Sequence, residues 1–102
     1  MAKKSSIVKN NKRRQLVAKH AETRSSLKRR IKISTDFDEI RELVMLLDNM
    51  AKDSSATRVR NRCAVKHCGR PRGFYRLTGM CRCCSQSNYK QSNIPGLSKA
   101  SW

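Results

Sequence analysis

The spacing of four cysteines constrains the fold of this chain more than any other feature. Cys63 and Cys68 are separated by four residues, twelve residues follow, and Cys81 and Cys84 are separated by two. Two short-spaced pairs can supply the four thiolates of a tetrahedral zinc site, one pair from each of two loops. The spacing therefore predicts a zinc knuckle over residues 63–84 that holds one zinc ion through these four side chains.

The cysteine pattern leaves other interpretations open. His67 could replace Cys68 as a ligand, and Cys83 could replace Cys84. Five cysteines without an apparent export signal argue against a secreted disulfide framework. A redox site at Cys81 to Cys84 would be expected at the start of a helix within a βαβ pattern, which the sequence does not show. Reduced cysteines that bind no metal are the simplest alternative.

The charge of the chain is large and unevenly distributed. The net charge is +17 over 102 residues, and five of the seven acids lie between Asp36 and Asp48. Residues 1–32 hold twelve Lys and Arg with one acid, whereas residues 54–102 hold ten and no acid. Self-repulsion at this charge opposes compaction, so a polyanionic partner is expected. Nucleic acid is the favoured partner, and an anionic membrane surface is the main alternative.

Several classes of protein are not expected. The longest apolar run is far shorter than the ~18 residues of a membrane span, so no membrane-spanning segment is predicted, and nucleic acid is favoured over a membrane partner. Residues 54–102 contain no acidic residue, so they offer neither paired carboxylates nor a Ser-His-Asp arrangement. We expect neither an enzyme nor a protein with a small-molecule substrate.

Two helices are predicted in the N-terminal half. Residues 1–14 form a basic arm that we expect to be disordered until it binds RNA. Residues 12–32 have the pattern of a mostly polar helix with a thin apolar stripe. Residues 36–52 carry apolar side chains at helical spacing and predict an amphipathic helix, with Thr35 and Asp38 forming a capping box. This helix should pack against the first helix or against a neighbouring protein.

The predicted fold is mainly α with little regular sheet. Extended basic helices precede a small C-terminal module that resembles a zinc ribbon. We divide the chain into a basic arm with two helices over 1–53, a basic linker over 54–62, the zinc knuckle over 63–84 and a tail over 85–102. The residues after Cys84 are polar and have no usable periodicity.

Arginines and aromatic residues around the predicted knuckle are candidates for RNA contact. The arginines of residues 58–62 alternate along the chain, so an extended segment would place them on one side. Residues 70–76 interleave arginines with two aromatic residues. Guanidinium groups bind phosphate in a bidentate manner, and aromatic rings stack on unpaired bases. The predicted RNA-binding residues are Lys12, Arg13, Arg14, Arg58, Arg60, Arg62, Arg70, Arg72, Tyr75, Arg76, Arg82 and Lys99.

Several segments resemble a known family. They are Arg-Asn-Arg-Cys63, Cys-Gly-Arg-Pro-Arg-Gly73, Tyr75-Arg76, Gly79-Met-Cys-Arg82 and Ile-Pro-Gly-Leu-Ser-Lys-Ala-Ser-Trp102. Together they resemble ribosomal protein fourteen of the small subunit, in its long bacterial or organellar form. The resemblance extends over the whole chain, and its specific motifs lie in residues 58–102.

The resemblance implies a structural protein of the ribosome, in the mitochondrial matrix or the bacterial cytoplasm. Such a protein binds small-subunit ribosomal RNA in the head near the decoding site, supports assembly and translation, and contacts neighbouring head proteins. Some family members hold zinc through two C-x2-C pairs. Three of the four cysteines match that pattern, and Cys63 is displaced by two extra residues.

Two features depart from the family pattern, and two other functions remain as alternatives. Leu77-Thr78 replaces an expected Lys-Phe pair, and the segment beginning at Ser85 replaces an amphipathic helix, which we expect to be shortened or replaced by a loop. A zinc-dependent DNA-binding regulator is the alternative function, followed by a thiol oxidoreductase or metal carrier.

Overall fold

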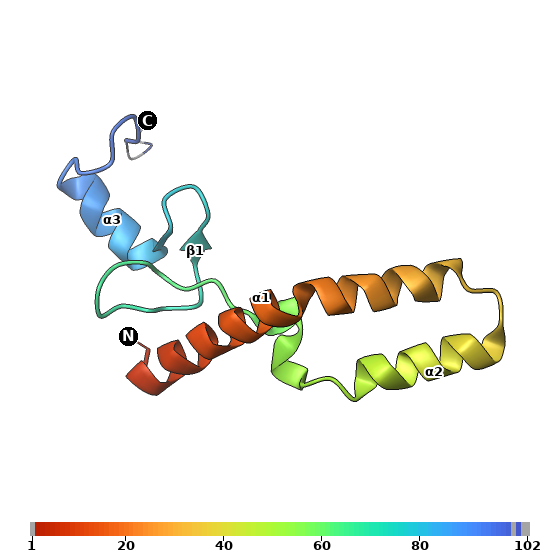
Figure 1. Ribbon diagram of the computed structural model, residues 1–102. Helices are drawn as coiled ribbons and strands as arrows, with labels where there is room; N and C mark the ends of the chain where they lie inside the picture. Colours follow the sequence, from red (N-terminus) through yellow and green to blue (C-terminus); the bar gives the residue numbers. More distant parts are fainter. Residues whose placement is uncertain (1, 99, 101–102) are drawn as a thin grey trace. The chain divides into compact units, whose positions relative to one another are not determined.

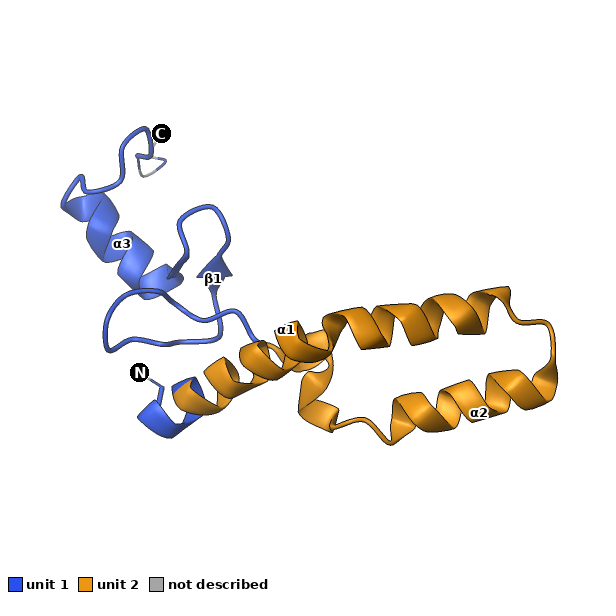
Figure 2. Cartoon of the chain, in the orientation of Figure 1, with its two compact units in different colours: residues 1–7, 60–102 blue, residues 8–59 orange. Residues whose placement is uncertain are grey.

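The protein is mainly helical and has one small sheet (Figure 1). The computed structural model describes residues 2–98 and 100. The chain divides into two compact units (Figure 2). Unit 1, also called the C-terminal unit, consists of residues 1–7 with 60–102, and unit 2, also called the N-terminal unit, consists of residues 8–59. The elements are α1 (Lys4–Ile33), α2 (Phe37–Asp48), the 3-10 turns η1 (Lys52–Ser54) and η2 (Ala56–Arg58), β1 (Phe74–Tyr75), β2 (Met80–Cys81) and α3 (Arg82–Lys90). The predicted fold class is confirmed.

Helix α1 is one continuous helix of 30 residues. It begins at Lys4, so the structure differs from the expected disordered arm. The segment has no Gly or Pro and is rich in Lys and Arg, which have high helix propensity. Arg30 and Lys32 lie in its last turn, where cations interact favourably with the helix dipole. Among the described residues, no helix is long and apolar enough to cross a membrane.

Helix α2 has the amphipathic character predicted from the sequence, although it ends at Asp48, four residues before the expected position. Its buried or half-buried side chains are Ile40, Leu43 and Leu47, which lie at i, i+3 and i+7 on one face. Leu43 is only 3% exposed and is the buried apolar residue of this unit. The helix therefore stabilises unit 2 through one narrow apolar face.

The predicted capping box at the start of α2 is wrong. Asp36 occupies the N-cap position, and no side chain there forms a capping hydrogen bond. Asp38 and Glu39 still lie in the first turn, where carboxylates interact favourably with the partial positive charge of the helix N-terminus. The N-terminal end of α2 is therefore stabilised by the interaction of these carboxylates with the helix dipole rather than by a reciprocal hydrogen-bonded cap.

Polar contacts attach the segment after α2 to α1. The carboxylate of Asp53 accepts a hydrogen bond from Arg13 at 3.1 Å and forms an ion pair with Arg58 at 3.1 Å. Arg24 donates a hydrogen bond to the hydroxyl of Ser54 at 3.0 Å, and Ser54 is almost completely buried. Part of the stretch expected to be a linker is therefore folded into unit 2.

The C-terminal unit contains a two-stranded antiparallel sheet followed directly by a helix. Strand β1 pairs with β2, with Phe74 opposite Cys81 and Tyr75 opposite Met80. The β1–β2 turn includes Gly79, whose φ of +68° is in the left-handed region that favours glycine. This hairpin carries Cys81 to the first turn of α3.

Of the two outcomes expected for the segment after Cys84, a shortened helix or a loop, the structure contains a helix, α3. The helix spans Arg82–Lys90, and Ser85 on it is fully buried. The amide of Asn88 donates hydrogen bonds to the carbonyl oxygen of Cys84 at 2.8 Å and to the sulfur of Met80 at 3.4 Å. Polar side chains that contact the sheet and the helix backbone hold α3 in place. The segment therefore lacks the apolar periodicity from which a helix would be predicted.

Candidate metal centre and nucleic-acid interface

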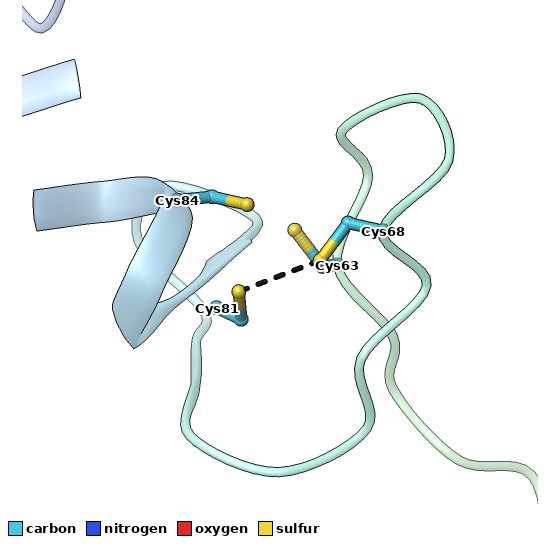
Figure 3. A group of neighbouring side chains, drawn as sticks. All are labelled: Cys63, Cys68, Cys81 and Cys84. Carbon is cyan, nitrogen blue, oxygen red and sulfur yellow. Dashed lines mark hydrogen bonds between the residues drawn. The ribbon is translucent and has the colours of Figure 1, made fainter. Parts of the chain in front are cut away.

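Four cysteine sulfurs converge in the C-terminal unit (Figure 3). The Sγ atoms of Cys63, Cys68, Cys81 and Cys84 all lie within 4.8 Å of one another. The Sγ atoms of Cys68 and Cys81 are 3.6 Å apart. Four sulfurs at about 2.3 Å from a tetrahedral zinc ion would be about 3.8 Å apart. The cluster therefore has nearly the dimensions of a four-thiolate zinc site and is consistent with zinc binding.

The first pair of cysteines is held by a loop with its own hydrogen bonds. The backbone N–H of Cys63 donates to the carbonyl oxygen of Arg70 at 3.1 Å, which brings together the two ends of the loop. The N–H of Cys68 donates to the carbonyl of Val65 at 3.2 Å and closes a turn. Gly69 follows with a φ of +57°, a backbone conformation that L-residues adopt at a cost. The sequence thus positions both sulfurs through turn chemistry.

The second pair of cysteines is held by the junction between the sheet and α3. Cys81 ends β2 and is fully buried, and Cys84 lies three residues later in the first turn of α3. The N–H of Arg82 donates to the carbonyl oxygen of Gly73 at 2.7 Å, which fixes the start of the helix against the loop before β1. This geometry directs both thiols to the same point.

The thiols of the cluster have unequal acidity. Burial raises the pKa of Cys81, but hydrogen bonds from the backbone N–H of Cys84 and from the thiols of Cys84, Cys68 and Cys63 more than offset this effect and lower the pKa to about 6. The pKa of Cys84 is raised, chiefly because its thiol donates a hydrogen bond to Cys81. The cluster therefore stabilises a first thiolate at Cys81 and keeps a proton on Cys84.

The pKa of Cys68 is also raised. The backbone N–H of Arg70 acts in the opposite direction, but burial and the thiols of Cys81 and Cys63 outweigh it. Thiolates are the metal-binding form of cysteine, so a divalent cation that binds this cluster must displace protons from it.

The two alternative ligands considered from the sequence lie outside the cluster. His67 is exposed and has a φ of +67°. Cys83 is exposed on α3, and its sulfur accepts a hydrogen bond from the guanidinium of Arg70 at 3.2 Å. The structure therefore brings together Cys63, Cys68, Cys81 and Cys84 without either alternative.

The N-terminal turn of the chain packs on the loop that carries Cys68, a contact that sequence reasoning missed. The N–H of Ala2 donates to the carbonyl oxygen of Cys68 at 3.0 Å. Gly69 is in such close contact with Ile7 that an added Cβ would lie 2.5 Å from the Ile7 Cδ1 atom. Arg62 donates to the carbonyl oxygen of Gly69 at 3.0 Å. This part of unit 1 joins residues that are far apart in the sequence.

The structure separates the predicted RNA-binding residues into two groups. Four of them make contacts within the protein: Arg13, Arg58, Arg62 and Arg70. Exposed side chains are found at Lys12, Arg14, Arg60, Arg72, Tyr75, Arg76 and Arg82. Lys99 lies outside the described residues. Of this exposed group, Lys12, Arg14, Arg72, Tyr75, Arg76 and Arg82 are available to a partner without breaking the ion pairs and hydrogen bonds described above, whereas Arg60 also interacts within the protein.

A second group of cations lies on α1, outside the residues named individually from the sequence. Arg24, Lys28, Arg29 and Lys32 line a groove between α1 and the segment 54–57. Three of these residues recur at intervals of four, a spacing that places them along one face of a helix. That spacing was the available signal, but the groove itself depends on how the later segment folds back.

The fold and the cluster define a small, strongly basic protein with a four-cysteine module. Residues 46–101 match the family model described as Ribosomal protein S14p/S29e. The chain is 42% identical to small ribosomal subunit protein uS14c of Mesostigma viride and 41% identical to uS14 of Legionella pneumophila (strain Paris). It is 45% identical to uS14A of Mycobacterium ulcerans. Each match covers 100% of both chains.

The chain belongs to the Ribosomal protein S14p/S29e family, among the uS14 proteins. The resemblance noted from the sequence is therefore confirmed. The family consists of ribosomal proteins, which are structural rather than enzymatic. Membership of this family replaces the two alternative functions considered from the sequence, a DNA-binding regulator and a thiol oxidoreductase.

Replacing Gly69 with Ala is expected to destabilise the C-terminal unit more than replacing Gly79 with Ala. Both glycines have positive φ, so each change costs about 1–2 kcal/mol for the left-handed backbone. At Gly69 the new methyl group also overlaps Ile7, whereas an added Cβ at Gly79 meets no heavy atom within 4 Å. Overpacking adds roughly 1–3 kcal/mol. Denaturant unfolding of the two full-length variants measures the difference, and equal destabilisation would show that Ile7 does not pack on Gly69.

Proposed function

We propose that this protein is a component of the small ribosomal subunit that binds small-subunit ribosomal RNA in the head near the decoding site. In this role it supports assembly and translation by neutralising and positioning folded RNA. The observation that carries the proposal is the exposed cationic surface beside the four-cysteine cluster, in a segment without any acid, together with family membership. Because residues 54–102 contain no carboxylate side chain, the exposed arginines there have no internal counterion within their own segment.

A zinc ion held by Cys63, Cys68, Cys81 and Cys84 is part of this proposal. Four thiols are a soft donor set suited to zinc, and their separation fits a tetrahedral shell. Four protein ligands leave no open position, so the ion would be structural. Among the described residues of the C-terminal unit, the buried apolar side chains are Cys63 and Cys81 themselves. A unit with so small a core needs the additional stabilisation of a metal.

The exposed side chains near the cluster suit an RNA surface. Arg72, Arg76 and Arg82 are exposed and can bind phosphate oxygens through two parallel hydrogen bonds. On β1, Phe74 is half-buried and Tyr75 is 50% exposed, as expected for alternating residues of a strand. Tyr75 can therefore stack on an unpaired base while Phe74 packs inside the unit.

Helix α2 suits a neighbouring protein rather than RNA. Phe37 is 90% exposed, and Val44 and Met45 are exposed on the same side of the helix. Asp38 and Glu42 lie beside this apolar strip, and carboxylates are repelled by phosphate. An apolar strip flanked by acids fits a basic, partly apolar surface, which is the expected character of an adjacent head protein.

The relatives include bacterial proteins and uS14c proteins of Chlorokybus atmophyticus and Mesostigma viride. We propose that the protein is a component of a ribosome of bacterial type, in a bacterial cytoplasm or in an organelle. The exposed surfaces described above serve that role in either compartment.

Replacing Cys81 with Ser is expected to abolish stoichiometric zinc binding, whereas Cys83 to Ser retains it. Cys81 is a buried member of the cluster, and Cys83 lies outside it on the surface. Loss of a structural zinc removes on the order of 10 kcal/mol of binding energy that is coupled to folding. Metal analysis of the purified full-length variants gives zinc per chain, and hydrogen exchange reports the order of residues 60–98. Full zinc content in the Cys81 variant would contradict the ligand assignment.

Replacing Arg76 with Gln is expected to weaken RNA binding and to reduce its salt dependence, whereas Arg41 to Gln leaves both nearly unchanged. Both residues are exposed arginines, so each change removes one positive charge. Loss of one phosphate contact makes the slope of log K against log salt shallower by about one. Filter binding to protein-free small-subunit ribosomal RNA over a series of salt concentrations measures this slope. Equal slopes for the two variants would argue against an RNA surface at β1.

Replacing Phe37 with Ser is expected to reduce incorporation into small subunits severalfold without changing affinity for isolated ribosomal RNA. Leu46 to Ser is the matched control, because Leu46 is also exposed on α2 but lies away from the strip of Phe37 and Val44. Quantitative mass spectrometry of purified subunits measures incorporation. A lower RNA affinity in the Phe37 variant would instead place RNA on this helix.

A further inference from the structure

The N-terminal unit contains an open groove of about 490 Å³, and none of the predicted RNA-binding residues lines it. One wall is a face of α1 between Val17 and Lys32, and the other is the segment 54–57 after α2. Ala21 on the first wall and Ala56 on the second are small and exposed. The groove is therefore formed by one unit alone.

The α1 wall of the groove has a concentrated positive charge. Arg24, Lys28 and Lys32 recur at intervals of four, so they form a row roughly 12 Å long on the helix, with Arg29 beside it. Like charges at this spacing destabilise a helix. No acid lines the groove in the part of the chain that the structure describes. The row is thus unfavourable for the isolated protein, as expected for a site that binds an anion.

Three other cations of the same unit are paired internally, in contrast to the exposed cations of the groove. Arg13 and Arg58 share Asp53, and Arg30 lies 3.6 Å from Glu39. Within the described residues, Lys28, Arg29 and Lys32 form no ion pair of this kind. The carboxylates of Asp53 and Glu39 are therefore used by cations outside the groove lining.

The second wall of the groove is ordered by hydrogen bonds. Ser54 is 1% exposed, accepts a hydrogen bond from Arg24 at 3.0 Å and donates one to the carbonyl oxygen of Ala51. The hydroxyls of Ser55 and Thr57 lie 2.9 Å apart. Arg24 is half-buried and held in place by Ser54, so the groove combines a fixed guanidinium, exposed ammonium groups and hydroxyls.

We propose that this groove binds the ribose-phosphate backbone of an RNA strand. A linear row of cations fits successive phosphates better than one small anion. The hydroxyls opposite the row can both donate hydrogen bonds to phosphate and accept them from ribose 2′-hydroxyls, which a purely cationic surface cannot do. The inference rests on the proposed function, because it assigns a second contact region to the same ribosomal RNA.

The first test compares paired charge losses inside and outside the groove. Lys28→Gln with Lys32→Gln removes two charges from the groove, and Lys19→Gln with Arg41→Gln removes two exposed charges outside it. Filter binding of the full-length zinc-loaded proteins to protein-free small-subunit ribosomal RNA is measured against salt. We expect the slope of log K against log salt to become shallower by roughly 1.5–2 for the groove pair and clearly less for the control pair.

The outcomes distinguish this inference from the proposed function. If Arg76→Gln reduces the slope and the groove and control pairs behave alike, RNA binding stands and the groove assignment is overturned. If none of the variants changes the slope, both proposals are overturned.

A second test identifies the occupant of the groove directly. A benzophenone amino acid in place of the exposed Thr57 is incorporated into small subunits and irradiated, and the adducts are identified by mass spectrometry. Crosslinks to nucleotides support the inference. Crosslinks only to an acidic protein segment overturn it.

Discussion

The convergence of four thiols is the interaction on which the C-terminal unit depends. Cys63 and Cys68 come from a loop and Cys81 and Cys84 from the junction of β2 and α3, in a unit that contains few buried apolar side chains. Around them, the sheet, the start of α3 and the N-terminal turn each contribute one or two backbone hydrogen bonds. Such contacts stabilise a fold only when the loops that carry them are already ordered. The zinc ion proposed for the cysteine cluster would provide this order and so position the exposed arginines.

The scarcity of acids determines how the cations are used. With 24 basic and seven acidic residues, most cations lack a carboxylate partner. Asp53 joins Arg13 to Arg58 and so attaches the segment after α2 to α1. Surface ion pairs of this kind contribute little individually, about 0–1 kcal/mol. Because these pairs use Arg13 and Arg58, the arginines near the cluster and the cations of the α1 groove remain available to a polyanion.

Some features could be predicted from residue patterns, and others could not. The apolar periodicity of α2 and the spacing of the cysteines predicted a helix and a four-cysteine cluster, and both are present. The sequence left open whether the α3 segment is a shortened helix or a loop, because the helix is stabilised by Asn88 and buried Ser85 rather than by an apolar stripe. The continuous α1 was missed because a highly charged segment was interpreted as a disordered arm. Local patterns could not reveal contacts that neighbouring elements provide.

The sequence by itself determined the chemistry: the number and spacing of thiols, the excess of positive charge, and the family to which the chain belongs. Only the tertiary structure decided which side chains share a site. It separated Cys83 and His67 from the cluster, paired Arg13 with a carboxylate forty residues away, and placed the cations of α1 opposite the hydroxyls of residues 54–57. The physical reason is that cluster geometry, ion pairing and groove shape depend on distances between residues remote in sequence, which the path of the folded chain sets.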